Sequence, residues 1–366
     1  MNRIRKIIIC FVAVLFLGFV LLGRNNSHAQ QMPPNPKTSP TPPPIGTPTP
    51  EIIDEDDGII NIDTEVVNVL FTAQDRKRRL LTSLKKGDVR IFENGKPQEV
   101  VSFSRKVDLP LSLTILIDTS ASQERTLPQE KEAAMSFLES VVRPTKDEVA
   151  IVSFTGEATL EQGMTSNIAR LRRAVDRVRF SPPSGYVGGG VVVGSPPISG
   201  RNRNVSGSTA IWDALWVTSE EILGPSPDKT RRAIVLLTDG VNTYGVKKMK
   251  DAVQASLKAE AVIYSIGIGD NFYDGVNKGV LKKVSERTGG RAFFPRDEGE
   301  LRQAFKQIQE EMRSQYLIVY EPIDQTRDGR YRKIEIKVAD PQLSKQKVRL
   351  TYRNGYFAKT AKKKTD

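Results

Sequence analysis

The sequence predicts an α/β protein: a doubly wound, mostly parallel sheet, flanked by a small β-sandwich-like unit built from N- and C-terminal segments of the chain. Strand-like and helix-like segments alternate from residue 110 to residue 312, which is typical of consecutive βαβ units. Two of the strand-like runs, 113–117 and 233–238, contain only apolar or β-branched residues, as strands buried on both faces of a parallel sheet do. The segments on either side of this region show β patterning, which predicts the flanking unit.

The first 29 residues have the form of an export signal. A basic start, 2–6, precedes an almost wholly apolar run, 7–22. Small residues, Ser27 and Ala29, occupy the two positions that determine cleavage, so we expect cleavage after Ala29 and export to the periplasm, the cell surface or the medium. The alternative is an uncleaved anchor, for which the apolar run is short.

Residues 30–57 follow as a linker that is rich in proline and ends in an acidic patch. Residues 58–107 then form a predicted small β module, in which Asn94-Gly95 is a strong hairpin signal. Its expected strands are 66–73, 89–92 and 100–103.

The central domain, 110–312, is predicted from periodicity and helix-start signals. Pro128 lies in the first turn of one expected helix, and apolar residues spaced by three, four and three positions define another at 168–178. The expected segments are strand 111–117, helix 128–142, strand 149–154, helix 168–178, a helix opened by Thr209, strand 233–238, helix 249–259, strand 261–268, helix 278–288, strand 292–294 and a helix from residue 300. A Gly/Pro/Ser-rich stretch, 181–208, interrupts them, either as a selectivity loop or as a disordered insertion.

After the central domain the chain returns to β patterning over residues 313–358, and a basic tail, 359–366, follows. The expected strands are 315–320, 331–338 and 348–352. This segment and the module at 58–107 are each too small to bury a good core alone. We therefore expect them to pack together, with the central domain inserted between them.

Composition excludes several classes of function. Cys10 and His28 are the only cysteine and histidine, and both lie in the export signal, so the mature chain can form no disulfide, Cys/His zinc site or Ser-His-Asp triad. The formal net charge is +12, and removing the four basic residues of the signal leaves +8. Aromatic residues make up only 7% and do not alternate with the basic ones, which argues against nucleic-acid binding. We expect the positive charge of an exported chain to give only weak attraction to anionic membrane lipid or cell-wall polymer.

Oxygen-bearing side chains follow the two buried strands. Asp118 ends the first, with Ser120 and Ser122 at alternate positions after it, so that in a tight turn their oxygens can converge. Such hard donors suit Mg²⁺ first, and Mn²⁺ or Ca²⁺ next. Thr209 stands at the mouth of an expected helix, and Asp239 follows the second buried strand. Ligands of open α/β sheets bind beyond such strand ends. The alternatives are an ordinary turn, and acids that cap helices.

Together and in this order, these segments resemble the metal-ion-dependent adhesion site (MIDAS) of von Willebrand factor A-type (VWA) domains. The family's D-x-S-x-S falls on Asp118, Ser120 and Ser122, its second-loop Thr on Thr209 and its third-loop Asp on Asp239. The resemblance implies metal coordination by Ser120, Ser122 and Thr209, with a supporting or water-mediated role for the two acids. It also implies a non-enzymatic binding protein, whose metal takes an Asp or Glu carboxylate from a partner protein. The alternative is a structural scaffold or assembly factor of the cell envelope with a vestigial site.

The order of the whole chain is similar to that of the VWFA-related domain family of exported bacterial proteins. Its motifs here are F-E-N-G-K-P at 92–97, Q-Y-L-I-V-Y-E-P at 315–322 and N-G-Y-F at 354–357. This resemblance covers roughly residues 60–358 and implies a fold and a location rather than a molecular function. An enzyme of the haloacid-dehalogenase kind would need a second acid two residues after Asp118, where this chain has Ser120.

Overall fold

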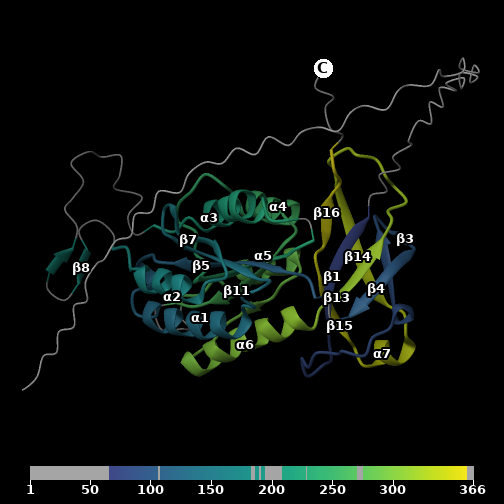
Figure 1. The fold of residues 1–366 in the computed structure, drawn as a ribbon, viewed down its shortest axis with the longest axis horizontal. Coiled ribbons are helices and arrows are strands. Elements are labelled where there is room, and N and C mark those ends of the chain that lie inside the picture. The colour runs from purple at the N-terminus through teal and green to yellow at the C-terminus, as the bar shows by residue number, and fades with distance from the viewer. Residues whose placement is uncertain are drawn as a thin grey trace, which may run out of the picture. The chain divides into compact units, whose positions relative to one another are not determined.

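The computed structural model describes residues 66–105, 108–182, 186–188, 191–193, 208–227, 229–269 and 275–360 (Figure 1). All of them belong to one compact unit, Ile62–Asp366. The expected export signal and linker, most of the 181–208 stretch and nearly all of the basic tail lie outside the described residues. Within the described part of the chain, no helix is long and apolar enough to span a bilayer.

The central domain is built on a sheet with the strand order β12-β11-β10-β5-β6-β7. Neighbouring strands are parallel except β7, which runs antiparallel to β6 at one edge. The strands are β5 (Leu111–Asp118), β6 (Glu148–Phe154), β7 (Ala158–Thr165), β10 (Arg231–Thr238), β11 (Ala261–Gly267) and β12 (Ala292–Phe293). The predicted doubly wound, mostly parallel sheet is therefore confirmed.

Helices cover both faces of this sheet (Figure 1). One face packs against α1 (Leu127–Val141), α2 (Ile168–Arg177) and α6 (Glu298–Arg313), and the other against α3 (Ile211–Val217), α4 (Met249–Lys258) and α5 (Lys278–Thr288). In β5, Ile115 and Ile117 join the first core and Leu116 joins the second. This is why the run 113–117 has no charged position: both faces of the strand are buried.

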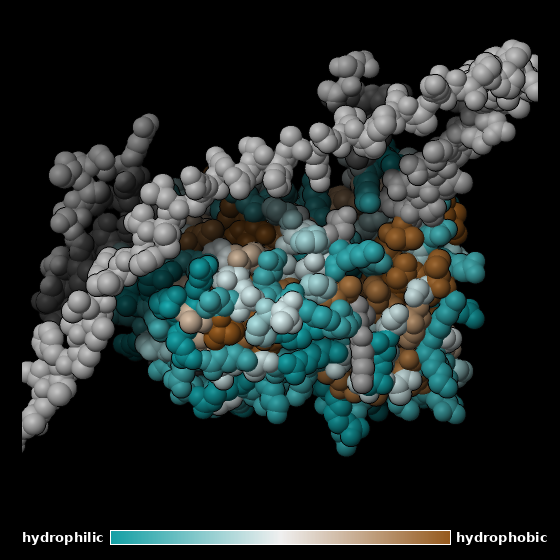
Figure 2. Space-filling view, in the orientation of Figure 1, coloured by the Kyte–Doolittle hydropathy of each residue, from teal (hydrophilic) through white to brown (hydrophobic). Residues whose placement is uncertain are grey.

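The flanking β unit contains two antiparallel sheets, in the orders β15-β1-β13-β4 and β16-β14-β2-β3. Its strands are β1 (Val67–Gln74), β2 (Val89–Glu93), β3 (Lys96–Gln98), β4 (Val100–Arg105), β13 (Tyr316–Tyr320), β14 (Tyr331–Val338), β15 (Arg349–Tyr352) and β16 (Gly355–Phe357). One shared core includes Phe71 and Ile318 from the first sheet and Ile91 and Ile336 from the second. The predicted unit made of N- and C-terminal segments is thus confirmed. On the face seen in Figure 2, hydrophobic residues gather over this unit, while the central domain is mostly hydrophilic.

Some predicted details are wrong. Asn94 and Gly95 form the predicted tight turn, with φ of 48° and 82°, but the turn joins β2 to β3. Strand 100–105 crosses to the other sheet and pairs with β13, so 89–92 and 100–103 are not hairpin partners. Strand β7, helix α7 (Pro341–Lys345) and a π-helical extension of α3, Thr218–Leu223, were not expected. In the 181–208 stretch, β8 (Tyr186–Gly188) and β9 (Val191–Val193) pair as a short hairpin.

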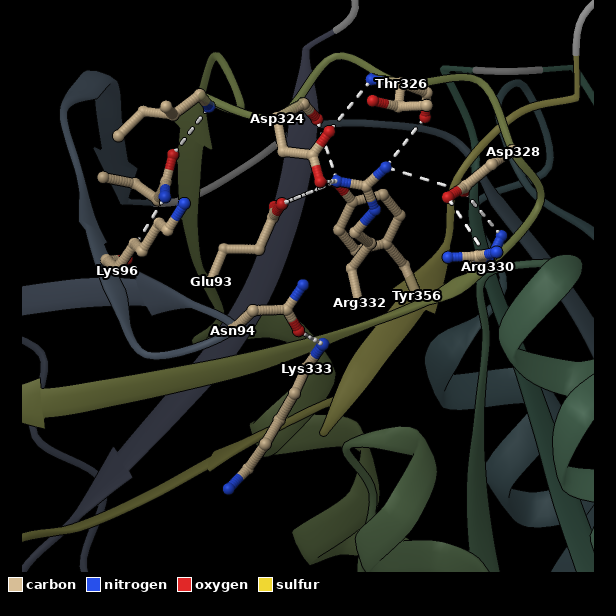
Figure 3. A network of polar contacts seen from close by, with 12 residues as sticks. Glu93, Asn94, Lys96, Asp324, Thr326, Asp328, Arg330, Arg332, Lys333 and Tyr356 are labelled. Atoms are coloured by element: carbon tan, nitrogen blue, oxygen red, sulfur yellow. Dashed lines mark hydrogen bonds and ion pairs between the residues drawn. The ribbon is translucent and has the colours of Figure 1, made fainter.

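The sequence motifs that suggested the VWFA-related family meet inside the β unit. Glu93 of F-E-N-G-K-P is buried and accepts hydrogen bonds from Tyr320 Oη at 2.8 Å and Tyr356 Oη at 2.9 Å. Arg332, also buried, lies 3.6 Å from the Glu93 carboxylate and donates to the carbonyls of Asp324 and Thr326 (Figure 3). The three motifs therefore encode one buried polar cluster that joins distant parts of the chain.

Candidate metal site

Asp118, at the end of β5, is fully buried and holds two segments together. Its Oδ1 accepts the backbone N–H of Ser120 at 2.9 Å, which closes the turn after the strand. Its Oδ2 accepts the hydroxyl of Thr238, the last residue of β10, at 2.6 Å. The adjacent parallel strands β5 and β10 thus end side by side, with one carboxylate between them.

Ser120 and Ser122 bring two hydroxyls together in the turn after Asp118. Their Oγ atoms lie 3.4 Å apart; Ser120 is buried and Ser122 is partly exposed. Buried Gln123 donates from Nε2 to Ser122 Oγ at 3.2 Å and to the carbonyl of Ile268, just beyond β11, at 3.1 Å. This amide links the serine turn to a third strand of the sheet.

Asp239 follows β10 and is also buried. Its Oδ1 accepts the backbone N–H of Val241 at 2.8 Å, and its carbonyl accepts the N–H of Asn277, the N-cap residue of α5. The next residue, Gly240, has a φ of +81°, and a Cβ atom there would lie 2.8 Å from Leu281 Cγ. Glycine at this point lets the chain turn tightly against α5.

Thr209 reaches the same edge of the sheet through its backbone. Its N–H donates to Thr243 Oγ1 at 2.8 Å, and its carbonyl accepts the N–H groups of Thr243 and Tyr244, which lie just after Asp239. The next residue, Ala210, donates to the carbonyl of Thr155, just beyond β6. All five predicted site residues therefore lie at the carboxyl ends of the central strands.

The site is electrostatically unusual because two buried acids act on each other. Burial raises the pKa of Asp118 to about 7, and the negative charge of Asp239 acts in the same direction. Hydrogen bonds from Ser120 and Thr238 lower the pKa but do not offset the effect of burial. A cation nearby would favour the charged forms of both carboxylates. The helix-cap alternative is wrong: both acids accept an amide two residues ahead, while Thr126 and Lys248 are the N-cap residues of α1 and α4.

The donor chemistry fits a hard divalent cation. The side-chain donors are oxygen atoms of two acids and three hydroxyl residues, a set that suits Mg²⁺ rather than a metal preferring sulfur or imidazole. Among the residues that the structure describes, no group of three or more His, Cys, Asp or Glu is able to hold a metal. A cation at this edge of the sheet would therefore depend on the hydroxyls.

Sequence reasoning missed several residues that support the site. Thr238 bonds to Asp118, Gln123 bonds to Ser122, and Asp213 accepts the N–H groups of Val246 and Lys247. Asp213 lies in the first turn of α3. Thr238 is separated from Asp118 by 120 positions. No local pattern marks such a contact.

Glu130, on α1, is another buried acid that the sequence did not indicate. Its Oε1 accepts the Thr126 hydroxyl at 2.8 Å, and its Oε2 has no hydrogen-bond partner among the described residues. Burial, assisted by the charges of Asp118 and Asp239, raises the pKa of Glu130 to about 8. Glu130 is therefore protonated at neutral pH when no cation offsets these charges.

Comparison with known proteins identifies the central domain. Residues 113–242 match one family model described as von Willebrand factor type A domain, and residues 201–307 match a second with the same description. No curated protein matches the chain.

Solved structures are similar at low identity. An aerotolerance-related membrane protein from Bacteroides fragilis NCTC 9343 has 16% identity and a TM-score of 0.40, covering 55% of this chain and 100% of its own. The hypothetical protein BatB from Bacteroides thetaiotaomicron has 16% identity and a TM-score of 0.41, covering 55% and 97%. Proximal thread matrix protein 1 from the mussel byssus, with a zinc-occupied MIDAS motif, has 16% identity and a TM-score of 0.43, covering 57% and 49%.

Proposed function

Because the chain carries a von Willebrand factor type A domain, a module of protein interaction, we propose that it is an exported, non-enzymatic binding protein with a metal-dependent adhesion site. Ser120, Ser122 and Thr209 would coordinate the metal, and Asp118 and Asp239 would support it indirectly or through water. The partner is a protein that offers an Asp or Glu carboxylate.

One observation carries this proposal: the fully buried Asp118 lies beside the charge of Asp239, next to paired serine hydroxyls. Burying two neighbouring carboxylates is unfavourable unless a cation or protons offset their charge. Thr238 and the Ser120 amide fix the orientation of Asp118, so the carboxylate is held in place without a cation. The partly exposed Ser122 supports access from solvent.

A bound divalent cation supplies a coordination position for a partner carboxylate oxygen. The hydroxyl ligands are neutral and leave most of the cation's charge available for that carboxylate. Mg²⁺ is our first choice, because it retains water readily and needs few protein ligands. The proposed action makes and breaks no covalent bond, in keeping with a mature chain that lacks histidine and cysteine.

The test is metal-dependent thermal stability of the purified protein. After EDTA treatment, Mg²⁺, Mn²⁺, Ca²⁺ or Zn²⁺ is added, and the melting temperature is recorded for the wild type, Asp118→Asn and Ser122→Ala. A ligand present at 100 times its Kd stabilises the folded state by about 2.7 kcal/mol, so we expect a clear rise that both variants lose.

Ser136→Ala is the matched control, because Ser136 is exposed on α1 and should leave the metal response unchanged. A wild type whose melting temperature does not respond to any of the four metals would contradict the proposal and favour the scaffold alternative.

A further inference from the structure

Exposed apolar side chains cluster in the segment that follows Asp239. Of the eight large apolar residues that are exposed among the described residues, three lie within six consecutive positions: Val241 at 40%, Tyr244 at 39% and Val246 at 89% exposure. Four others are spread over the β unit, at Val66, Val101, Ile323 and Tyr331. We call residues 240–248 the apolar loop.

The apolar loop is fixed to the start of α3 by its own polar groups. Asn242 Oδ1 accepts the N–H of Trp212 at 3.3 Å, and Asn242 Nδ2 donates to the Tyr244 carbonyl at 2.7 Å. Asp213 accepts the N–H of Val246 at 3.1 Å and that of Lys247 at 3.2 Å. With the bonds between Thr209 and Thr243, these contacts hold the loop against the site.

Close packing at Gly245 supports the same conclusion. Its φ is +110°, a conformation that other residues rarely adopt, and a Cβ atom would lie only 2.0 Å from Asp213 Oδ2. Lys247 is also fixed, since its Nζ lies 3.9 Å from the centre of the Trp216 ring. The loop is therefore ordered at both ends while its apolar side chains face water.

A fixed loop that presents apolar side chains to water is typical of a recognition surface. Core packing does not explain Val246, which is almost wholly exposed. An ordered loop loses little conformational entropy when a partner binds, so that apolar contact contributes more fully to affinity. The loop begins next to Asp239, and the backbone of Thr209 bonds to Thr243 and Tyr244 within it, so the loop is tied directly to the residues of the metal site.

We propose that the apolar loop selects the partner: it binds an extended peptide segment whose Asp or Glu is flanked by apolar residues. This inference rests on the proposed function, because the carboxylate is the group that would bind at the metal site. The flanking apolar side chains pack on Val246 and Tyr244, and the segment is recognised by both chemistries together.

Immobilised synthetic peptides test this selectivity with the purified protein in Mg²⁺ and in EDTA. The probes are Gly-Leu-Asp-Leu-Gly, Gly-Ser-Asp-Ser-Gly and Gly-Leu-Asn-Leu-Gly on a common linker. In Mg²⁺ we expect the Leu-flanked Asp peptide to bind about tenfold more tightly than the Ser-flanked one, as burial of one aliphatic side chain would give.

The variants Val246→Ser and Tyr244→Ser should reduce this preference to near unity, and Val246→Ser should leave the melting temperature unchanged because Val246 is 89% exposed. Val101→Ser is the matched control: Val101 is 58% exposed on β4 in the other unit and should leave the preference intact.

The outcomes separate the two proposals. Equal binding of Leu- and Ser-flanked peptides, with Asp preferred over Asn only in Mg²⁺, overturns the selectivity and keeps the metal-dependent site. Binding that is the same for Asp and Asn, or the same in Mg²⁺ and EDTA, overturns the proposed function and this inference with it.

Discussion

At the scale of single residues, the buried acids make stability depend on pH. Glu130 has an ordinary pKa of 4.5 and a folded-state pKa of about 8. Between these pH values the folded chain keeps a proton that the unfolded chain has released. The free energy of unfolding therefore falls as pH rises, by up to about 1.4 kcal/mol per pH unit for one such group, and the fall ends above the folded pKa.

We expect Glu130→Gln to flatten this fall in EDTA, since glutamine keeps the shape without an ionisable proton. Urea denaturation at pH 5, 6, 7 and 8 measures it. The raised pKa of Asp118 also makes the free energy of unfolding fall as pH rises, so Glu130→Gln should keep part of the pH dependence. Glu132→Gln, on the exposed side of α1, is the control. Identical slopes for the wild type and Glu130→Gln would show that Glu130 is not protonated in the folded state.

Glu93 allows a second prediction at this scale. Its carboxylate accepts two tyrosine hydroxyls and lies beside buried Arg332. Arg332 keeps its ion pairs with Asp324 and Asp328, but removing the carboxylate takes away the acceptor of two buried tyrosine hydroxyls, at about 1–3 kcal/mol for each bond. We expect Glu93→Ala to lower the free energy of unfolding by roughly this amount in chemical denaturation. The control is Glu99→Ala at an exposed position, which should change the free energy of unfolding by less than about 0.5 kcal/mol. An equally small change for Glu93→Ala would show that the buried polar cluster does not stabilise the β unit.

The residue scale also shows what sequence can and cannot reveal about the site. Asp118, Ser120 and Ser122 are recognisable because their spacing is local, and Asp239 because it ends a buried strand. Thr238 and Gln123 act through contacts with distant segments, so neither spacing nor residue type marks them. Glu130 sits at a helix position where an exposed glutamate would be unremarkable; only the packing of α1 buries it.

At the scale of elements, the strands that are buried on both faces are the ones that the sequence predicts best. Strands β5 and β10 are buried on both faces and show continuous apolar runs. Strand β7, at the sheet edge, is mostly half-exposed or exposed, so A-T-L-E-Q-G-M-T shows no strand periodicity and was missed. The turn at Asn94-Gly95 was predictable from its residue types, but the crossing of β4 to the other sheet depends on its pairing with β13, more than 200 positions away.

The apolar loop gives the prediction that belongs to this scale. Gly245→Ala places a methyl group against Asp213 and requires a φ of +110° from a residue with a Cβ atom. Backbone strain of this kind costs about 1–3 kcal/mol and would shift the loop away from Thr209. We expect weaker Mg²⁺ binding, measured as a smaller metal-dependent rise in melting temperature. Gly163→Ala on β7, where nothing lies within 4 Å of the added atom, is the control. An unchanged metal response would show that the loop does not support the site.

At the scale of the whole molecule, the central domain and the β unit are joined by buried polar contacts. Glu311 of α6 is buried, pairs with Arg291 and accepts a hydrogen bond from Gln74 of β1 at 3.1 Å. Arg353 donates to Glu260 at 2.8 Å and to the carbonyl of Asn68 at 2.7 Å. Helix α6 also leads into β13, an inner strand of the β unit. Such an interface should make the two parts unfold together.

Glu311→Ala tests this coupling. The change removes the bond from Gln74, which should cost the interface about 1–3 kcal/mol, and it also leaves Arg291, in the central domain, without its buried partner. We expect one calorimetric transition for the wild type and two for the variant, in which the central domain unfolds first, because it also loses the ion pair of Arg291. Exposed Glu310→Ala, next to it on the same helix, should keep one transition. If Glu311→Ala also unfolds in one transition at an unchanged temperature, the coupling does not depend on this contact.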